Sequence, residues 1–411
     1  MSDEKVFYYG VTRFSVYFPR STAWKISSQL TEHDYISQLY SDERLGPRFD
    51  IFLDRALPIY ESYTERYNYK HIIQYSEELP QKWKDKLFEA KEKYPFLLLY
   101  KVRGEVDYKN IIEEGVSFSS SGDAVVVVFR VDDDDLLSHD YLDQLSHYAA
   151  FGFFGMSVSF SLGVVAKYQC GEYRDFRVLR KHLMSQGQAT IGKFVKEEER
   201  FYLPSSVSHM ETDLHRPVII DSRKPAFLQT LHASQDTRAS VGEKGNISVI
   251  DQELSNNKSI DDFESFISPF PTIIDDFVKC KESRVILLEY TSSDGKGFNP
   301  SFEVDISQAG NYRVSYELKF EGEVLSNKKG LLLCMGVASQ DIAEVSGMSL
   351  SKRPEIGWFK YIPVAGGAVK SSFEFSVSEC SSVDNIFLKE WAYKGEFEVI
   401  MLVVERLGGV V

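Results

Sequence analysis

The strongest constraint on the fold of this chain is a run of four aspartates that directly follows its most apolar strand. The segment 124–131 reads Ala-Val-Val-Val-Val-Phe-Arg-Val, a β-branched run typical of a strand buried on both faces. Asp132, Asp133, Asp134 and Asp135 come next. Adjacent carboxylates repel one another, so they can be buried only if a cation or N–H donors offset their charge. The sequence therefore predicts an acidic group at the carboxyl end of a central strand.

Strand and helix patterns alternate around this central strand. Apolar β-forming runs occupy 6–14, 71–75 and 96–102, and apolar residues recur at helical spacing in 48–67 and 79–90. Strands that alternate with helices predict an α/β domain with a Rossmann-type, mostly parallel sheet. Ligands bind at the carboxyl edge of such sheets, so we expect the acidic run to line a binding site. The alternative is a solvated acidic loop that caps the next helix.

The overall charge and the cysteines argue against several classes of protein. The formal net charge is −14, whereas a nucleic-acid-binding protein needs a basic surface. The four cysteines are scattered without a CxxC pair, so neither a zinc site nor a disulfide framework is predicted. The first ten residues lack the apolar stretch of a secretory signal, so we expect a cytoplasmic protein. Segment 148–166 is uncharged, but its alternating serines predict a strand rather than a membrane helix.

The second half of the chain has a different pattern. Apolar and polar residues alternate in 311–322, and further short alternating runs follow, which is typical of a β-sandwich. A polar stretch over 233–262 lacks apolar periodicity. We therefore predict an α/β domain over 1–240, a connecting segment over 241–280 and a β-sandwich over 281–411.

Several segments of the first half resemble bacterial rhamnosyltransferase-type glycosyltransferases. These segments are GVTRFSVYFP at 10–19, the stretch 48–87 that begins RFDIFLDRALPIY and ends KWKDKL, YPFLLLYKV at 94–102, VFRVDDDDLLSHDYLDQL at 128–145 and KPAFLQTLHASQDT at 224–237. The resemblance extends from about residue 6 to residue 237, and it implies a GT-A-like fold for the α/β domain. The R-x-D-x-D-D pattern at 130–135 corresponds to the DxD motif of GT-A enzymes.

The resemblance implies transfer of a sugar from a dTDP-, UDP- or GDP-linked donor to an oligosaccharide or lipid-linked glycan. Such a role fits bacterial surface polysaccharide synthesis at the inner face of the membrane. It also implies Mg²⁺ or Mn²⁺, which would offset the charge that develops on the leaving diphosphate. Matching the motif assigns Asp132 to the donor and Asp134 and Asp135 to the metal, although four adjacent aspartates leave the register open. Thr12 and Arg13 are placed to meet the nucleotide.

Other polar residues of this half have two interpretations each. Arg130 either binds a phosphate or pairs with its acidic neighbours. His232 either joins the metal or is a structural histidine beside an apolar strand. Glu211 and Asp213 are candidates for the base that deprotonates the acceptor hydroxyl, or else surface carboxylates. The arginine-rich segment 173–183 either holds a phosphate or forms a solvated basic helix face.

Two other functional classes stay open from the residues alone. Clustered carboxylates at a strand end also suit a metal-dependent phosphoryl-transfer enzyme. A non-enzymatic carbohydrate-binding or assembly protein would instead use the β-sandwich. There, the pairs Trp358-Phe359 and Trp391-Tyr393 either stack on sugar rings or fill the core. We expect this domain to bind glycan or to mediate homo-oligomerisation rather than to carry out chemistry.

Overall fold

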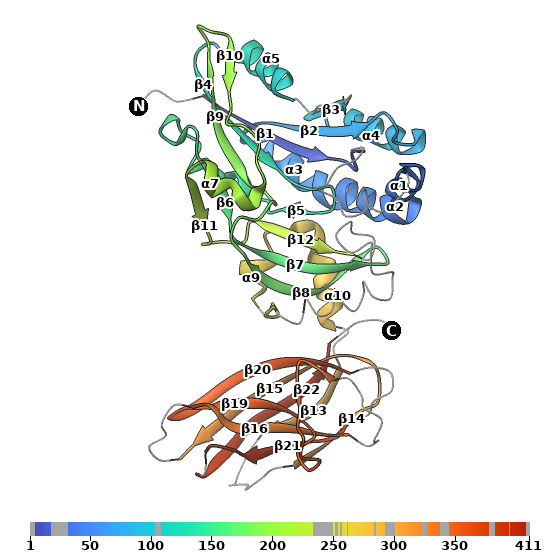
Figure 1. Cartoon of the computed structure of the whole chain (residues 1–411), viewed down its shortest axis with the longest axis vertical. Coiled ribbons are helices and arrows are strands. Elements are labelled where there is room, and N and C mark those ends of the chain that lie inside the picture. The colour runs from blue at the N-terminus through green and yellow to red at the C-terminus, as the bar shows by residue number, and fades with distance from the viewer. Residues whose placement is uncertain are drawn as a thin grey trace. The chain divides into compact units, whose positions relative to one another are not determined.

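The chain divides into two compact units, Met1–Phe277 and Val278–Val411 (Figure 1). The computed structural model describes residues 5–17, 32–102, 108–232, 250, 254, 257–260, 262–282, 285–291, 301–321, 327–337, 345–377, 383–393 and 395–407. Within these residues, no helix is both long enough and apolar enough to cross a lipid bilayer.

The first unit is built on a mixed sheet with the strand order β11-β6-β9-β4-β1-β2-β3, and β10 pairs antiparallel with β9. The strands are β1 (Lys5–Arg13), β2 (Asn68–Ser76), β3 (Leu97–Val102), β4 (Ala124–Arg130), β6 (Ser157–Phe160), β9 (Ala189–Val195), β10 (Arg200–Tyr202) and β11 (Val218–Asp221). The neighbouring strands β4, β1, β2 and β3 run parallel to one another, as predicted. However, β9 runs antiparallel to both β4 and β6, so the sheet as a whole is mixed.

β4 occupies the centre of this sheet, and its residues from Ala124 to Phe129 are buried. This position explains the continuous β-branched run, because both faces of a central strand pack against apolar side chains. The described helices before β6 are α1 (Glu32–Leu39), α2 (Asp42–Asp50), η2 (Ile51–Ala56), α3 (Leu57–Tyr63), α4 (Gln81–Lys93), α5 (Lys109–Ser119), α6 (Tyr141–Ser146) and η3 (Phe151–Phe153).

The helix α2 begins at a side-chain cap and continues without interruption into a wider turn. The hydroxyl of Ser41 accepts a hydrogen bond from the backbone N–H of Arg44, which satisfies one of the free donors at the helix start. The wide π-turn η2 follows directly and ends at Ala56, and Pro58, whose ring nitrogen cannot donate to the helical ladder, lies in the first turn of α3. The face of α2 that is turned inward carries Arg44, Leu45, Arg48 and Phe49.

A second, smaller sheet of the first unit has the order β5-β12-β7-β8. Its strands are β5 (Leu136–Leu137), β7 (Leu162–Gln169), β8 (Glu172–Arg180) and β12 (Phe227–Leu231). Segment 148–166 contributes β6 and the start of β7, so the prediction of a strand there is confirmed. The basic segment 173–183 lies largely in strand β8, so the expectation of a solvated basic helix face is wrong.

The predicted connecting segment 241–280 contributes several buried residues to the first unit. Ile250 and Leu254 pack in one apolar cluster with Val165 of β7 and Leu231 of β12. Further along lie α9 (Phe263–Phe266), η6 (Pro271–Ile273) and α10 (Ile274–Glu282). In Figure 1, α9 and α10 lie beside β8, and the ring of Phe277 in α10 is 5.3 Å from that of Phe176 in β8. Residues 233–249 lie outside the described part of the chain. The compact first unit therefore extends to Phe277, whereas the sequence pattern placed its end at 240.

The second unit consists of two five-stranded antiparallel sheets with a shared core, so the predicted β-sandwich is confirmed. One sheet has the order β13-β22-β15-β20-β17 and the other β14-β21-β16-β19-β18. The strands are β13 (Val285–Thr291), β14 (Ser301–Ile306), β15 (Gly310–Phe320), β16 (Asn327–Val337), β17 (Val345–Ser346), β18 (Ser349–Leu350), β19 (Trp358–Val364), β20 (Gly367–Val377), β21 (Val383–Glu390) and β22 (Phe397–Arg406).

The four residues of the two aromatic pairs lie in different places in the sandwich. Trp358 and Tyr393 pack against the core. On the other face of their sheet, the ring of Phe359 lies 5.2 Å from that of Tyr361, which in turn lies 6.3 Å from the ring of Trp391. Trp391 is exposed. Three of the four residues therefore pack against apolar clusters, as the core interpretation predicts, whereas Trp391 is exposed.

Candidate functional site

The acidic run lies at the carboxyl end of β4, next to the end of β1. The backbone N–H of Val131 donates to the carbonyl oxygen of Val11, which carries the pairing of the two strands up to the first aspartate. Asp133, Asp134 and Asp135 are 3%, 6% and 4% exposed, so the alternative of a solvated acidic loop is wrong. Three adjacent buried carboxylates require hydrogen-bond donors around them. Each of the three has a different set of donors.

Asp133 connects the run to the end of β1 and to α2. Its Oδ2 accepts hydrogen bonds from the backbone N–H and the hydroxyl of Ser15, both at 3.0 Å, and its Oδ1 accepts from Arg48. Ser15 has a φ of 46°, a left-handed conformation that turns its N–H toward the carboxylate. Burial raises the pKa of Asp133 to about 6, although the charge of Arg48 opposes the shift. Asp133 is therefore a structural anchor.

Asp134 meets a histidine from the distant strand β12. Its Oδ2 lies 3.0 Å from Nε2 of His232 and 3.0 Å from Nη1 of Arg48. Burial alone would raise the pKa of Asp134, but Arg48 and the hydrogen bond from His232 hold it below its usual value, so this carboxylate is ionised. Burial lowers the pKa of His232, so its imidazole is neutral, the form that binds metal ions.

Asp135 connects the run to β12. Its Oδ1 accepts from the backbone N–H of Thr230 at 2.8 Å, and its Oδ2 accepts from Nε2 of Gln186 at 2.7 Å. Burial, together with the charges of Asp134 and Asp132, raises its pKa well above the usual value. Both oxygens thus serve N–H donors of the protein, and this arrangement does not favour Asp135 as a metal ligand.

Asp132 is the most exposed member of the run and lies among basic side chains. Its Oδ1 is 3.0 Å from Nη2 of Arg130, which is the pairing with an acidic neighbour that the sequence left open. Burial and the charge of Arg130 lower the pKa of Arg13, and the same two causes lower the pKa of His209. The side chains of Arg13, Arg130, Asp132 and His209 therefore lie within electrostatic reach of one another at the strand ends.

Thr12, by contrast, is enclosed in the sheet. Its hydroxyl donates to the carbonyl oxygen of Val131 at 3.0 Å and lies 2.9 Å from Nε2 of His71. On the other side of the imidazole ring, the hydroxyl of Tyr69 is 2.5 Å from Nδ1. Because the Thr12 proton is used at Val131, the hydroxyl accepts from Nε2–H of His71, and Nδ1 accepts from Tyr69. Thr12 thus binds the backbone at the end of β4, and its buried side chain is not accessible to a nucleotide.

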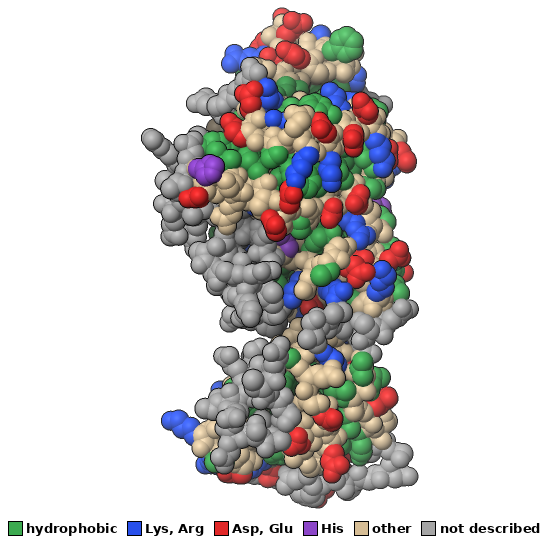
Figure 2. Space-filling view, turned by 90° about the vertical axis from the view of Figure 1, so that its right-hand side faces the viewer, with side chains coloured by type: hydrophobic (Ala, Val, Ile, Leu, Met, Phe, Trp, Pro, Cys, Tyr) green, Lys and Arg blue, Asp and Glu red, His purple; other side chains and the backbone are tan. Residues whose placement is uncertain are grey.

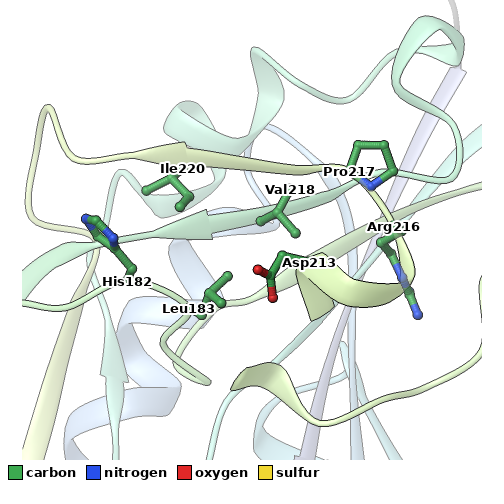
Figure 3. Close-up of a pocket in the computed structure, with 7 residues that line it drawn as sticks. All are labelled: His182, Leu183, Asp213, Arg216, Pro217, Val218 and Ile220. Carbon is green, nitrogen blue, oxygen red and sulfur yellow. The ribbon is translucent and has the colours of Figure 1, made fainter. Parts of the chain in front are cut away.

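The candidate base Asp213 lines an open pocket of about 580 Å³ (Figure 3). The other lining residues are His182, Leu183, Arg216, Pro217, Val218 and Ile220. Asp213 lies on α7 (Thr212–His215), which follows the short helix η4 (His209–Glu211). Glu211 is exposed and does not line this pocket.

The loop at 181–188 connects the pocket to the acidic run. His182 and Leu183 of this loop line the pocket, and Gln186 binds Asp135. The backbone N–H of Gly187 donates to the carbonyl oxygen of Arg130 at 2.8 Å. The hydroxyl of Thr212, next to Asp213, donates to the side chain of Gln188 at 3.1 Å. One loop therefore contacts both the end of β4 and the wall of the pocket.

Sequence reasoning missed the two arginines of α2 that face the acidic run. Arg44 and Arg48 lie one turn apart and are both 5% exposed. Nη1 of Arg44 donates to the hydroxyl of Ser15 at 2.8 Å and to the carbonyl oxygen of Leu39 at 2.9 Å. Their spacing of four residues, opposite an otherwise unbalanced run of aspartates, was the available signal.

Asp134 and His232 would together suit a divalent cation whose other ligands were phosphate oxygens and water. A carboxylate oxygen and an imidazole nitrogen suit Mn²⁺, and Mg²⁺ or Mn²⁺ at phosphate sites takes only one or two protein ligands beside phosphates and water. In the part of the chain that the structure describes, no group of three or more His, Cys, Asp or Glu side chains could hold a metal by itself. A cation at this position would therefore need ligands from the substrate.

The comparisons with known proteins concern mainly the first unit. The sequence profile of the Putative rhamnosyl transferase family matches residues 8–244. Among solved structures, the mannosyltransferase PcManGT from Pyrobaculum calidifontis, in complex with GDP-Man and Mn²⁺, is 12% identical, with a TM-score of 0.29. That match covers 68% of this chain and 75% of the other. No curated protein matches the chain.

Two further solved structures are similar to a comparable share of the chain. TarS 1-349 from S. aureus is 8% identical with a TM-score of 0.27, over 61% of this chain and 64% of that one, less than two thirds of its length. A glucose-1-phosphate thymidylyltransferase from Bacillus anthracis is 9% identical with a TM-score of 0.27, over 60% of this chain and 96% of that one.

Proposed function

The chain belongs to the Putative rhamnosyl transferase family, and from this premise we propose that its first unit transfers a sugar from a nucleotide-diphosphate donor to a glycan acceptor. The observation that carries the proposal is the contact of Asp134 with His232 at the carboxyl end of β4. Breaking the anomeric bond of such a donor leaves a nucleotide diphosphate, and its developing negative charge must be stabilised. Cationic groups at this strand end meet that need.

In this proposal, Asp134 and His232 would hold Mg²⁺ or Mn²⁺, and the donor diphosphate would supply further ligands. The metal would act as a Lewis acid that stabilises the charge on the departing diphosphate. Arg13 and Arg130 lie beside Asp132 and would add positive charge for the phosphates. Asp132 would accept a hydrogen bond from the donor ribose. Asp135 and Thr12 are omitted from the proposed site, because protein groups already use their polar atoms.

The pocket beside α7 is the proposed acceptor site. Asp213 would accept the proton of the attacking hydroxyl, as a general base must lie within hydrogen-bond reach of that group. Leu183, Val218 and Ile220 give the pocket apolar walls, and Arg216 and His182 add basic groups. Such a lining suits an acceptor that carries both an apolar and an anionic part, as a lipid-linked glycan does. A role in bacterial surface polysaccharide synthesis at the cytoplasmic face of the membrane is part of this proposal.

The second unit is proposed to bind the acceptor glycan or to mediate self-association. The exposed ring of Trp391 and the neighbouring rings of Tyr361 and Phe359 form an aromatic row on one face of the sandwich. Flat aromatic faces can stack on sugar rings.

On the first unit, acidic and basic side chains are interspersed on the face shown in Figure 2, which fits a protein that does not bind nucleic acid.

The proposed function is tested with a panel of donors. dTDP-rhamnose and the common UDP- and GDP-sugars would each be titrated calorimetrically into the full chain with Mn²⁺, and their hydrolysis would be followed by chromatography. We expect one nucleotide class to bind and to be hydrolysed slowly in a metal-dependent manner. If no nucleotide sugar binds under any condition, the proposal is wrong.

A further inference from the structure

Arg48 places a permanent positive charge at the position where a cation would bind. Its Nη1 atom contacts Oδ1 of Asp133 and lies 3.0 Å from Oδ2 of Asp134, the same oxygen that meets His232. The guanidinium is charged at every relevant pH and is largely buried, with 6% of its side chain exposed. The two aspartates thus share one arginine before any ligand binds.

The surroundings of Arg48 hold it in this place. The helix α2 is capped by Ser41, which fixes the turn that carries Arg44 and Arg48. Arg44 donates to the hydroxyl of Ser15, and Ser15 in turn donates twice to Asp133. Displacing Arg48 would leave Asp133 buried with less compensation, which is unfavourable. The guanidinium is therefore a fixed part of the site.

This fixed charge changes the affinity of Asp134 and His232 for a metal ion. A divalent cation bound to these two residues would lie close to the guanidinium and would be repelled by it, and water screens buried charges poorly. The carboxylate of Asp134 also attracts a cation less when Arg48 already offsets its charge. A nucleotide diphosphate brings its own negative charges, which attract both the metal and the arginine.

We propose that Arg48 is a positioning residue that makes divalent-cation binding depend on the nucleotide diphosphate. The inference rests on the proposed function for the identity of the second ligand. Without nucleotide, Arg48 holds Asp134 and keeps the affinity for free metal low. With nucleotide, the phosphates offset the combined charge of metal and arginine, and the metal binds tightly.

The test measures Mn²⁺ binding to the full chain by electron paramagnetic resonance, without nucleotide and with UDP, GDP or dTDP. For the wild-type protein, we expect at least one nucleotide to tighten Mn²⁺ binding about tenfold or more, since the coupling between two ligands is commonly of this size. For Arg48→Met, we expect tighter Mn²⁺ binding without nucleotide, by about the same factor, and a smaller effect of the nucleotide. Equal or weaker Mn²⁺ binding by Arg48→Met would overturn the inference.

A matched control comes from a second arginine of the first unit. Arg55 of η2 pairs with Asp276 of α10 at 3.2 Å and has no contact with the acidic run among the described residues. The variant Arg55→Met should therefore bind Mn²⁺ as the wild-type protein does. If both arginine variants gain the same affinity, the gain reflects the net charge of the protein, and Arg48 has no special role.

A charge-balanced variant covers the case in which Arg48→Met does not fold. The double variant Arg48→Met/Asp133→Asn removes one charge of each sign, and the amide oxygen can still accept from Ser15. Because the variant also loses the attraction of the Asp133 carboxylate, its gain in Mn²⁺ affinity should be smaller than that of Arg48→Met. Unchanged Mn²⁺ binding by this folded variant would contradict the inference, as would a complete lack of Mn²⁺ binding by the wild-type protein and the variants. The comparison without nucleotide needs no donor, so it remains informative even if the donor panel shows that the proposed function is wrong.

Discussion

The Oδ2 atom of Asp134 and the Nε2 atom of His232 lie 3.0 Å apart, although 98 positions separate the two residues in the chain. Asp134 follows the central strand of the large sheet, and His232 follows β12 of the small sheet. The contact therefore depends on how the two sheets of the first unit meet, and it links the strand that carries the acidic motif to a segment at the far end of the family match.

Removing either partner should strongly reduce metal-supported donor turnover. For Asp134→Asn and His232→Ala, we expect donor turnover with Mn²⁺ to fall about 100-fold or more, because a stabilising group for the leaving diphosphate is lost. The measurement is donor hydrolysis at saturating Mn²⁺, with circular dichroism as a check on folding. Asp143→Asn is a suitable control, since this half-buried aspartate pairs with Arg66 and Tyr67 rather than with the acidic run. Full activity of Asp134→Asn would contradict the proposed site.

The neighbouring Asp135 should respond differently to two substitutions. Asp135→Asn keeps an oxygen for the N–H of Thr230, and the side chain of Gln186 can rotate to accept from the new amide, so we expect nearly unchanged stability. Asp135→Ala leaves a buried N–H without its acceptor, which costs about 1–3 kcal/mol of unfolding free energy. Chemical denaturation of both variants measures the difference. If Asp135→Asn loses metal binding as severely as Asp134→Asn, Asp135 is a ligand after all.

His71 should make the stability of the first unit depend on pH. Burial lowers its pKa to about 3, whereas an exposed histidine has a pKa near 6.5. The neutral ring is favoured by folding, so its contribution is complete above pH 6.5 and is lost as the pH falls. The loss between pH 6.5 and pH 4.5 should be about 2 kcal/mol. Denaturation of the wild-type protein and of His71→Gln across this range provides the test, and identical pH slopes would exclude the effect.

The boundary of the first unit can be tested by truncation. A fragment ending at residue 282 retains α9 and α10 and should unfold cooperatively. A fragment ending at residue 240 lacks Ile250, Leu254, Phe270 and Ile273, all of which are buried, and should melt at a much lower temperature or aggregate. Thermal unfolding followed by circular dichroism distinguishes the two. Equal stability of both fragments would show that the segment after 240 contributes nothing to the core.

The two candidate bases can be separated by kinetics. Asp213→Asn should lower kcat for transfer to an acceptor about 100-fold or more, the usual contribution of a general base, and leave donor affinity unchanged. Glu211→Gln should behave as the wild-type protein, because Glu211 is exposed and lies outside the pocket lining. The opposite ranking of these two variants would move the acceptor site away from the pocket of Figure 3.

The central strand and the acidic motif could be predicted from sequence because both are local patterns. The separate tasks of Asp133, Asp134 and Asp135 could not, because identical adjacent side chains differ only in the partners that the fold brings to them. Arg48 was missed because most helical arginines are solvated.

The basic segment that forms β8 was mistaken for a helix because Arg174, Arg177 and Arg180 recur every third residue, as on one face of a helix. There, Asp175 has a φ of 53° and the pairing with β7 shifts register, which disturbs the alternation expected of a strand.

The hydrogen bond from the backbone of Thr230 to Asp135 restricts the positions at which insertions or deletions can be tolerated. Side chains alternate along β12, and a single insertion between Thr230 and His232 would turn the imidazole to the opposite face of the strand. The long stretch between β5 and β12, by contrast, can change length at its surface turns at a small entropic cost, since closing a longer loop costs little more than closing a shorter one. Descendants of this sequence can therefore vary in overall length, while the spacing of two residues from threonine to histidine stays fixed.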